Sequence, residues 1–280
     1  MTFSAQAIMN LISKTYGKDF CCYHQEFFTK CMESRKAKLE LNDTEAYVAL
    51  LLSSPEELSQ LEITLTNHFS IFFRNPSLFY TLEQYFLSPL IMEKEKKGRV
   101  ELRIWSMACA KGQEAYSLAM ILNDLLIRKN SKLDFRFFCS DKSPACIKKA
   151  ERGLFSKEDL EHISLARVDK YFETEGELYR IKSQLKEKMV FVSYDLLDPK
   201  SIAPSECIYN DFDIILCCNV LYYYSAQHQK RIIDKIKKSL GENGILITDD
   251  SEKDLISHHT GWTFNTIALP IFQNSPKEST

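Results

Sequence analysis

Residues 106–114 could form a ligand-binding loop. Their sequence is Ser-Met-Ala-Cys-Ala-Lys-Gly, followed by Gln113 and Glu114. Most of these residues are small, which lets a ligand approach the backbone closely. A dinucleotide site needs several glycines and a helix N-terminus free for pyrophosphate, but Gly112 is the single glycine in this run. Glu114 also places negative charge where a phosphate would sit. The loop therefore favours a cationic ligand such as a sulfonium, and an ordinary tight turn is the alternative.

Acidic side chains follow the next two candidate strands. Asp141 ends one of them, and a carboxylate at this position accepts hydrogen bonds from ribose hydroxyls in nucleotide sites. The alternative is a helix cap, because Asp141 also precedes the Lys-Ser-Pro that opens a helical stretch. Asp195 ends the other strand and suits an adenine amino group, with Leu196 packed against the ring. A surface turn explains Asp195 and Leu196 nearly as well.

A fourth apolar strand ends in Asn219, and the run Tyr222, Tyr223 and Tyr224 follows it. Three consecutive side chains cannot share one buried helical face. At least one tyrosine is therefore expected to point into a cleft or at a neighbouring element. For Tyr222 and Tyr224, packing against the N-terminal part of the chain is the alternative.

Short β-rich runs separated by longer helical stretches must position these residues. Strands are predicted at 101–106, 135–140, 190–194, 212–217 and 245–248. Strands that alternate with helices predict an α/β fold, a doubly wound, mostly parallel, Rossmann-like sheet covered on both faces. Such sheets bind ligands at the carboxyl ends of their strands, where the loops above lie. The last two runs, 262–269 and 270–272, predict a terminal antiparallel pair.

The first part of the chain has helical spacing of its apolar residues. Ser54 before Pro55, and Asn75 before Pro76, each supply an N-cap followed by a proline that suits a first helical turn. We expect a small all-α N-terminal domain over 1–92, a charged and solvated linker over 93–99, and the α/β domain over 100–280. The α/β domain is expected to carry a small β-subdomain around 171–188.

The composition limits the class of protein. With 280 residues, 45% of them hydrophobic, the chain can bury a full core. The 36 basic and 38 acidic side chains give a net charge of −2, which provides no long-range field for nucleic acid or an anionic membrane. The nine cysteines form no CxxC pair, so we expect neither a metal site nor a disulfide framework. Without a secretion signal or about 20 consecutive apolar residues, a cytoplasmic protein is expected.

Taken together, these segments resemble the CheR family of chemotaxis receptor methyltransferases. The resemblance is collinear over almost the whole chain and is carried by residues 65–74, 104–117, 139–141, 194–197, 217–223 and 244–252. It implies a class I methyltransferase fold and S-adenosylmethionine (SAM) as the cofactor, without a metal.

The resemblance also implies roles for individual residues. It places a set of side chains around the cofactor, namely His68, Ser70, Arg74, Glu114, Asp141, Asp195, Leu196, Cys218 and Asn219. Arg74 is expected to hold the cofactor carboxylate or the incoming glutamate, and Tyr223 to lie near the transferred methyl, so these two carry the catalytic roles.

The chain departs from the family pattern at several of these positions. In this chain His68 replaces the Asn of the family pattern, Ser70 a Thr and Ala108 a Gly. Gln113 replaces a Glu, Asp195 an Asn and Cys218 an Arg. The change at Cys218 matters most, because a thiol cannot replace the donors and charge of a guanidinium.

Family members contact their receptor through a basic helix of the N-terminal domain. The corresponding candidates here are Lys30, Arg35, Lys36 and Lys38, and a solvated charged face is the alternative. Some members also dock on a pentapeptide at the receptor tail through their β-subdomain. The corresponding stretch, 171–179, looks short, so no tail tethering is expected.

The resemblance implies an O-methyltransferase that forms γ-glutamyl methyl esters on the cytoplasmic domain of methyl-accepting chemotaxis receptors and releases S-adenosylhomocysteine (SAH). Two alternatives stay open. One is a methyltransferase of this fold with a different acceptor, and the other is a non-catalytic scaffold that binds SAM or SAH.

Overall fold

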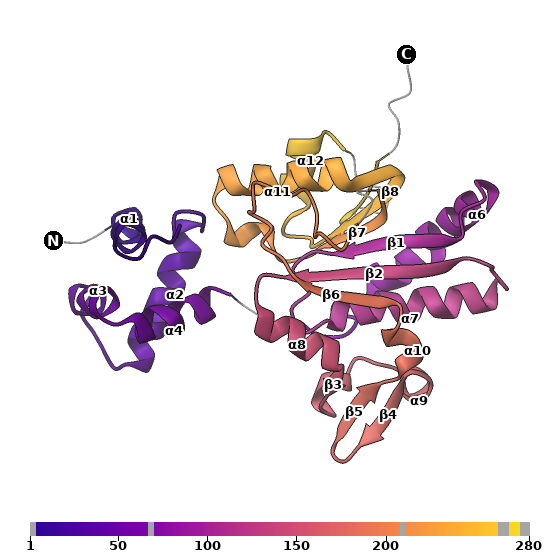
Figure 1. The fold of residues 1–280 in the computed structure, drawn as a ribbon, viewed down its shortest axis with the longest axis horizontal. Helices are drawn as coiled ribbons and strands as arrows, with labels where there is room; N and C mark the ends of the chain where they lie inside the picture. The colour runs from indigo at the N-terminus through magenta and orange to yellow at the C-terminus, as the bar shows by residue number, and fades with distance from the viewer. Residues whose placement is uncertain (1–3, 67–69, 208–210, 263–268, 275–280) are drawn as a thin grey trace. The chain divides into compact units, whose positions relative to one another are not determined.

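The structure is a computed structural model that describes residues 4–66, 70–207, 211–262 and 269–274 (Figure 1). The chain forms two compact units. The helical unit consists of Met1–Asn67 and Val220–Arg231, and the sheet unit of His68–Asn219 and Ile232–Thr280.

The helical unit packs four helices around one apolar core. The helices are α1 (Ala5–Tyr16), α2 (Gln25–Lys38), α3 (Thr44–Ser53) and α4 (Pro55–Leu65). Their starts follow from the sequence, because Asp43 caps α3 and Ser54, followed by proline, caps α4. The buried faces of the helices meet around Phe28, Tyr47 and Leu61, which are fully buried.

A distant segment completes the helical unit. It contains the short helix η3 (Leu221–Tyr223) and the first residues of α11 (Ala226–Ser239). Tyr224 pairs with Tyr23 in an isolated β-bridge, and the amide of Ser225 donates a hydrogen bond of 2.8 Å to the carbonyl of Cys22. These backbone contacts tie residues that follow the fourth strand to the loop before α2.

The sheet unit is built on six strands in the order β6-β2-β1-β7-β8-β9. The strands are β1 (Glu101–Ser106), β2 (Asp134–Asp141), β6 (Met189–Ser193), β7 (Phe212–Cys217), β8 (Leu240–Thr248) and β9 (Ile271–Gln273). All neighbouring pairs are parallel except β8 with β9. The predicted fold class is therefore confirmed. The last run does form an antiparallel strand, but it pairs with β8, and residues 263–268 of its expected partner lie outside the described residues.

Helices cover the sheet, some of them before β1 and others between its strands. They are α5 (Pro76–Thr81), the π-helix η1 (Leu82–Leu87), α6 (Ser88–Lys96), α7 (Gln113–Arg128), α8 (Pro144–Arg152) and α12 (Lys253–Thr260). Ile104 faces a core shared with α5, η1, α6 and α7, whereas the next residue, Trp105, packs on Phe212 at a ring distance of 5.3 Å. This alternation buries both faces of the sheet.

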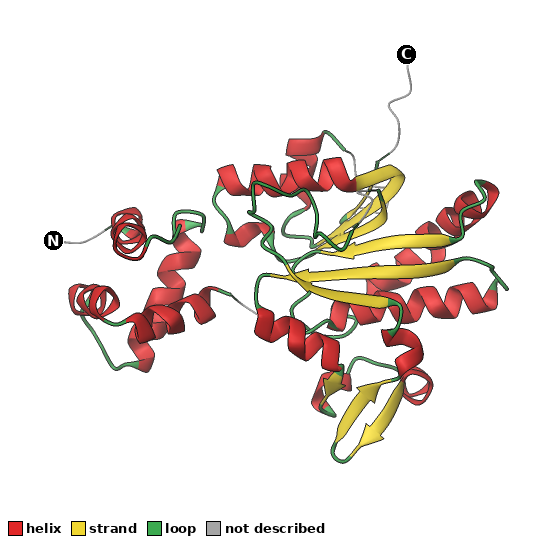
Figure 2. Cartoon of the chain, in the orientation of Figure 1, coloured by secondary structure: helices red, strands yellow, loops and turns green. Residues whose placement is uncertain are grey.

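A separate three-stranded antiparallel sheet lies within the sheet unit (Figure 2). Its order is β3-β5-β4, with β3 (Leu154–Phe155), β4 (Phe172–Glu175) and β5 (Leu178–Ile181), and the short helices η2 (Glu158–Leu160), α9 (Leu165–Tyr171) and α10 (Ser183–Lys186) flank these strands in sequence. Strands β4 and β5 fall in the stretch expected for a β-subdomain, and β3 lies before it.

The structure places the boundary between the units differently from the sequence prediction. The expected linker, 93–99, begins as the last residues of α6, and Lys94 is buried in an ion pair of 2.5 Å with Asp213 of β7. Leu82 and Ile91 pack in the core of the sheet unit, so the helices over 76–96 belong to that unit. The sequence does not reveal this ion pair, because Asp213 lies far from Lys94 along the chain. A charged run whose partner is not visible nearby is read as solvated.

Candidate functional site

The loop after β1 is tightly folded at the carboxyl edge of the sheet. The amide of Met107 donates to the carbonyl of Leu216 at 2.9 Å, and the amide of Cys109 donates to the carbonyl of Ser140 at 2.8 Å. Gly112 has φ of +87°, and a Cβ there would lie 3.1 Å from a ring carbon of Tyr116. The positive φ and this close contact favour glycine at the position where the loop enters α7.

Asp141 joins this loop to the end of β2. Its carboxylate accepts hydrogen bonds from the amide of Ala110 at 2.9 Å and from the amide of Ser143 at 2.8 Å. The side chain that caps α8 is Ser143, not Asp141. A carboxylate has lone pairs beyond these two bonds, so the ribose role predicted for Asp141 stays a prediction.

The ends of β7 and β8 are joined by a buried carboxylate. Glu252, 1% exposed, accepts from the amide of Asn219 and from the hydroxyl of Thr248, each at 2.9 Å. Asn219 has φ of +58°, a left-handed conformation that asparagine tolerates better than most residues. The site prediction did not include Glu252 or its neighbour Asp249, although both follow β8 at the same edge of the sheet.

Arg74 is brought to this edge through the first turn of α7. The amide of Phe73 donates to the hydroxyl of Ser117 at 3.0 Å, and that hydroxyl donates to the carbonyl of Gln113 at 2.7 Å. The chain at Arg74 is thereby anchored to the turn that carries Glu114.

These elements enclose a small pocket. Four of its lining residues are chemically distinctive: Arg74, Glu114, Cys218 and Asp249; Asn75, Leu78, Phe79, Leu216, Ile247 and Thr248 complete the lining. The structure thus brings together three predicted site residues that are far apart in sequence.

The electrostatics of the pocket are dominated by Glu114. Burial raises the pKa of Glu114 to about 7, the charge of Arg74 opposes the rise, and the charges of Asp249 and Glu252 add to it. The pKa of Asp249 is lowered; burial opposes this, but hydrogen bonds from Ser251 and Asn219 and the charge of Arg74 outweigh it. Strongly perturbed carboxyl groups in a pocket cluster at functional sites, which makes Glu114 a candidate for one.

Comparisons with known proteins agree with this geometry. Residues 68–267 match the family model described as CheR methyltransferase, SAM binding domain. The chain belongs to the CheR methyltransferase family.

Curated relatives of this CheR chain differ in length and in name. An uncharacterized 104.1 kDa protein of Rhodobacter capsulatus is 26% identical over 88% of this chain and 25% of its own length. The probable biofilm formation methyltransferase WspC of Pseudomonas aeruginosa is 27% identical over 89% of this chain and 57% of its own length. A chemotaxis protein methyltransferase of Listeria monocytogenes is 30% identical over 68% of this chain and 67% of its own length. The chain thus spans from a quarter to two thirds of these relatives.

Buried polar atoms at the CheR site fit a polar cofactor. Within the described ranges, the hydroxyl of Ser70, the side-chain amide of Gln113 and the side-chain oxygen of Asn219 have no hydrogen-bond partner in the protein. Buried polar groups are rarely left unpaired unless a ligand or water satisfies them. The acidic lining also suits the sulfonium and ammonium of SAM, so the residues present fit this cofactor.

Other predicted cofactor residues lie outside the pocket. Asp195 forms an ion pair of 3.1 Å with Lys142 and accepts from the amide of Leu197 at 2.9 Å, while Leu196 is buried. His68 lies outside the described residues. Their roles toward SAM stay predictions.

Tyr223 belongs to the helical unit. Its ring packs on Phe27 of α2 at 4.6 Å, and its carbonyl accepts from the amide of His24 at 2.8 Å. Tyr224 stacks on Tyr23 at 6.0 Å. Tyr224 therefore packs against N-terminal residues, which is the alternative given for it in the sequence analysis. Tyr223 packs against N-terminal residues as well.

The four basic candidates on α2 differ in exposure. Lys30 and Lys38 are exposed, whereas Arg35 binds Glu57 through two hydrogen bonds and Lys36 is buried with its amine 2.9 Å from the hydroxyl of Thr44. Arg35 and Lys36 are thus engaged inside the helical unit, which leaves Lys30 and Lys38 as the accessible candidates for receptor contact.

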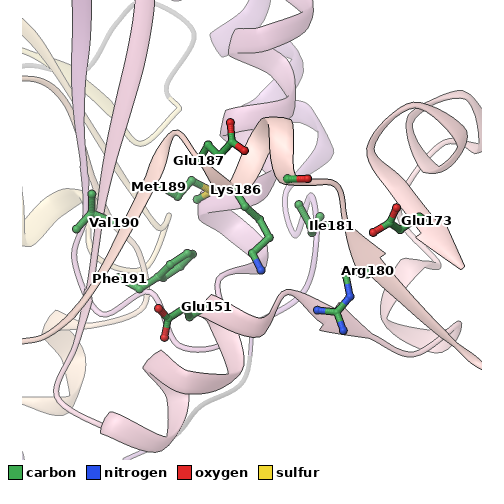
Figure 3. Close-up of a pocket in the computed structure, with 10 residues that line it drawn as sticks. Glu151, Glu173, Arg180, Ile181, Lys186, Glu187, Met189, Val190 and Phe191 are labelled. Atoms are coloured by element: carbon green, nitrogen blue, oxygen red, sulfur yellow. The ribbon is translucent and has the colours of Figure 1, made fainter. Parts of the chain in front are cut away.

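A larger groove of about 640 Å³ lies beside β6 and the small sheet (Figure 3). Residues of mixed charge line it, among them Glu151, Arg180 and Lys186, and none of the predicted cofactor residues does. No helix in the described ranges is both long and apolar enough to span a membrane, and the same residues contain no group of three or more metal-ligating side chains.

Proposed function

We propose that this CheR chain transfers the methyl group of SAM to glutamate side chains in the cytoplasmic domain of methyl-accepting chemotaxis receptors. The products are γ-glutamyl methyl esters and SAH, and the role is sensory adaptation in the cytoplasm. Family membership and the name of the Listeria monocytogenes relative support the proposal.

The observation that carries the proposal is the pocket in which Arg74, Glu114 and Asp249 meet at the carboxyl edge of the sheet. Arg74 is the group that would hold a carboxylate, and Glu114 and Asp249 would hold cationic groups of the cofactor. Asp141, Asp195 and Leu196 are proposed to hold the ribose and adenine.

The reaction needs positioning more than proton transfer. When bound, SAM supplies a methyl group on a sulfonium that a carboxylate can attack in line. A glutamate carboxyl group has a pKa near ~4.3, so the acceptor is ionised at neutral pH and no general base is required. The protein would orient the acceptor and exclude water from it, with Arg74 and Tyr223 near the reacting groups.

The proposal is tested with SAM carrying a radioactive methyl group, offered to the purified cytoplasmic domain of a receptor from the source organism. Label should enter the receptor and leave as volatile methanol after mild alkali, because esters hydrolyse there while N-methyl groups do not. The full chain with Arg136→Ala, a change of an exposed arginine on β2, is the matched control. Absence of base-labile label on any receptor domain would reject the proposal.

A non-catalytic scaffold is the second candidate, and Cys218 favours it. Burial, followed by the charges of Glu114 and Glu252, raises the pKa of the Cys218 thiol well above its usual value, so Cys218 offers the pocket a neutral group. Calorimetric binding of SAM without methylation of receptor or lysate proteins would support the scaffold. Label on a lysate protein other than a receptor would instead indicate a methyltransferase with another acceptor.

A further inference from the structure

Phe73, the residue before Arg74, has an unusual backbone conformation. Its φ is +49°, and within the described ranges it is the one aromatic residue with a positive φ. This left-handed conformation is costly for a bulky side chain, whereas glycine, asparagine and aspartate adopt it more readily. Such residues persist where the surrounding structure holds them, and they cluster at functional sites. The conformation of Phe73 therefore needs a structural cause.

The backbone of Phe73 is held by Ser117 of α7. Ser117 is fully buried, and its hydroxyl accepts from the amide of Phe73 at 3.0 Å while it donates to the carbonyl of Gln113 at 2.7 Å. A hydroxyl can make both bonds at once, so Ser117 satisfies a buried amide and also pairs its own proton. Ser117 thus fixes the peptide unit that leads into Phe73.

The ring of Phe73 is held by two further elements. It makes a T-shaped contact with Phe79 of α5 at 5.3 Å, and the guanidinium carbon of Arg167 on α9 lies 5.0 Å from its centroid. A cation over the face of a ring is attracted to it. Arg167 is itself placed by carboxylates on two other helices, Asp124 of α7 at 3.2 Å and Glu83 of η1 at 3.6 Å. The ring therefore cannot turn away without losing contacts on both sides.

The chain is also fixed on the other side of Arg74. Asn75 caps α5, because its side-chain oxygen accepts from the amide of Leu78 at 3.1 Å. The φ of Asn75, −120°, lies in the range that a following proline favours, and Pro76 is that proline. Arg74 therefore lies between two residues with fixed backbones, which set the direction of its Cα–Cβ bond.

We propose that Ser117 and Arg167 are positioning residues for methyl transfer, which hold Phe73 in its left-handed conformation and so direct Arg74 into the pocket. Among the described residues, neither Ser117 nor Arg167 lines the pocket, so each acts through Phe73. A small misplacement of a binding group can change a rate strongly even when its cause is remote from the reacting atoms. The inference rests on the proposed function, because it takes Arg74 as a residue of the reaction.

A double-mutant cycle with Arg74 tests the inference. We expect Ser117→Ala to lower kcat/KM for methylation of the receptor domain about tenfold in the unmodified chain, and less than about twofold in the Arg74→Ala background. A purely structural role would lower the rate by the same factor in both backgrounds. Equal factors in the two backgrounds, or no loss in the unmodified chain, would overturn the inference.

Tyr116→Phe is the matched control for Ser117→Ala. Tyr116 is the preceding residue of α7, it is fully buried, and its hydroxyl donates to the carbonyl of Ala150 at 2.8 Å. The change removes one buried hydrogen bond from the same helix without touching Phe73. It should reduce stability to a similar extent and leave methyl transfer unchanged in both backgrounds.

Arg167 has a control on its own helix. Arg167 and Lys170 both pair with Asp124, at 3.2 and 2.7 Å, and each lies over an aromatic ring, but the ring below Lys170 is that of Tyr171. Arg167→Gln should lower the rate about threefold, and Lys170→Gln should leave it unchanged. Because Arg167 is partly exposed, this pair decides the inference if Ser117→Ala fails to fold. Equal rates for the two variants would contradict a role through Phe73.

Hydrogen exchange of the full chain, measured by mass spectrometry over residues 70–80, gives a readout that needs no activity. Exchange should be faster in Ser117→Ala than in Tyr116→Phe, because only the first change releases the amide of Phe73. Equal exchange would overturn the inference whether or not receptors are methylated. Faster exchange in Ser117→Ala without methyl esters on receptors would instead support the placement of Phe73 and reject the proposed function.

Discussion

Two of the carboxylates that face an arginine, Glu57 and Glu114, behave oppositely. In the helical unit, Glu57 of α4 binds Arg35 of α2 through two hydrogen bonds of 2.8 and 2.6 Å and also accepts from the hydroxyl of Tyr47 at 2.9 Å. These bonds, led by those of Arg35, lower the pKa of Glu57. In the sheet unit, Glu114 faces Arg74, yet burial and two further carboxylates raise its pKa to about 7.

The difference separates a structural ion pair from a binding site. Glu57 has its donors within the protein, and these bonds from Arg35 and Tyr47 link the helices α2, α3 and α4. Glu114 lies in a pocket where burial and the charges of Asp249 and Glu252 outweigh the charge of Arg74. Proteins commonly retain such unfavourable charges where function requires them, at a cost in stability.

Breaking the structural pair should have the largest effect. The side chains of Arg35 and Glu57 are 12% and 7% exposed, so Arg35→Ala leaves a carboxylate buried without its main partner. The free energy of unfolding should fall by about 3 kcal/mol at pH 7. Urea denaturation of the full chain followed by circular dichroism measures this, with Lys30→Ala on the exposed face of α2 as the control.

The same pair predicts a pH dependence. Because the pKa of Glu57 is lowered in the folded state, its contribution to stability is present above the unfolded pKa of about 4.3 and is lost as the pH falls through the folded value. The difference between the unmodified chain and Arg35→Ala should therefore shrink below about pH 4. A difference that is the same at pH 7 and pH 3 would mean that Arg35 acts by packing alone.

Arg74→Ala should affect function without affecting the fold. Arg74 is exposed and its charge lowers the pKa of Asp249, so the denaturation midpoint should fall only slightly. Methyl transfer to receptor domains should fall at least ~100-fold, about 2.7 kcal/mol in activation free energy, because the variant cannot hold a carboxylate in place. Labelled SAM gives the rate, and Arg136→Ala is the control. Near-normal turnover would remove Arg74 from the site.

Glu114→Gln should make the protein more stable. The folded pKa of about 7 lies above the unfolded value of about 4.3, so the contribution of Glu114 to stability is lost as the pH rises from about 4.3 to 7. The variant should gain roughly 2 kcal/mol at pH 8 and almost nothing at pH 4, while its affinity for SAM falls. Thermal unfolding at both pH values, beside the exposed control Glu177→Gln, measures the gain. A loss of stability at pH 8 would show that Glu114 is a structural carboxylate like Glu57.

The sequence allowed much of the fold to be predicted. Strands 101–106 and 212–217 coincide with β1 and β7, because the central strands of a parallel sheet read as short apolar runs. The predicted boundary between the two units differs from the observed one. The helices over 76–96 have the same helical spacing of apolar residues as those before them, and only tertiary packing assigns them to the sheet unit. The pairing of β9 with β8 likewise depends on contacts that periodicity does not encode.

The candidate site was partly predictable. Arg74 and Cys218 are predicted from a family resemblance and Glu114 also from the loop after the first strand, and the structure brings them into one pocket. Asp249 was not included among the site residues, because an acidic residue after a strand reads equally well as a surface turn. The sequence predicts Arg35 as an accessible basic residue. Its partner Glu57 lies on another helix, and the local sequence does not indicate ion pairs between helices.

Tyr47→Phe should give the smallest of these effects and sharpen the comparison between the two carboxylates. Tyr47 is fully buried, and the change removes only its hydrogen bond to Glu57, which keeps both bonds from Arg35. A loss of about 1 kcal/mol is therefore expected, well below that of Arg35→Ala, with the exposed Tyr80→Phe as the control in the same urea series. If Tyr47→Phe costs as much as Arg35→Ala, then Glu57 needs every one of its donors. Glu114, for which Arg74 is the one cation that lowers the pKa among the described residues, is then even less well satisfied within the protein.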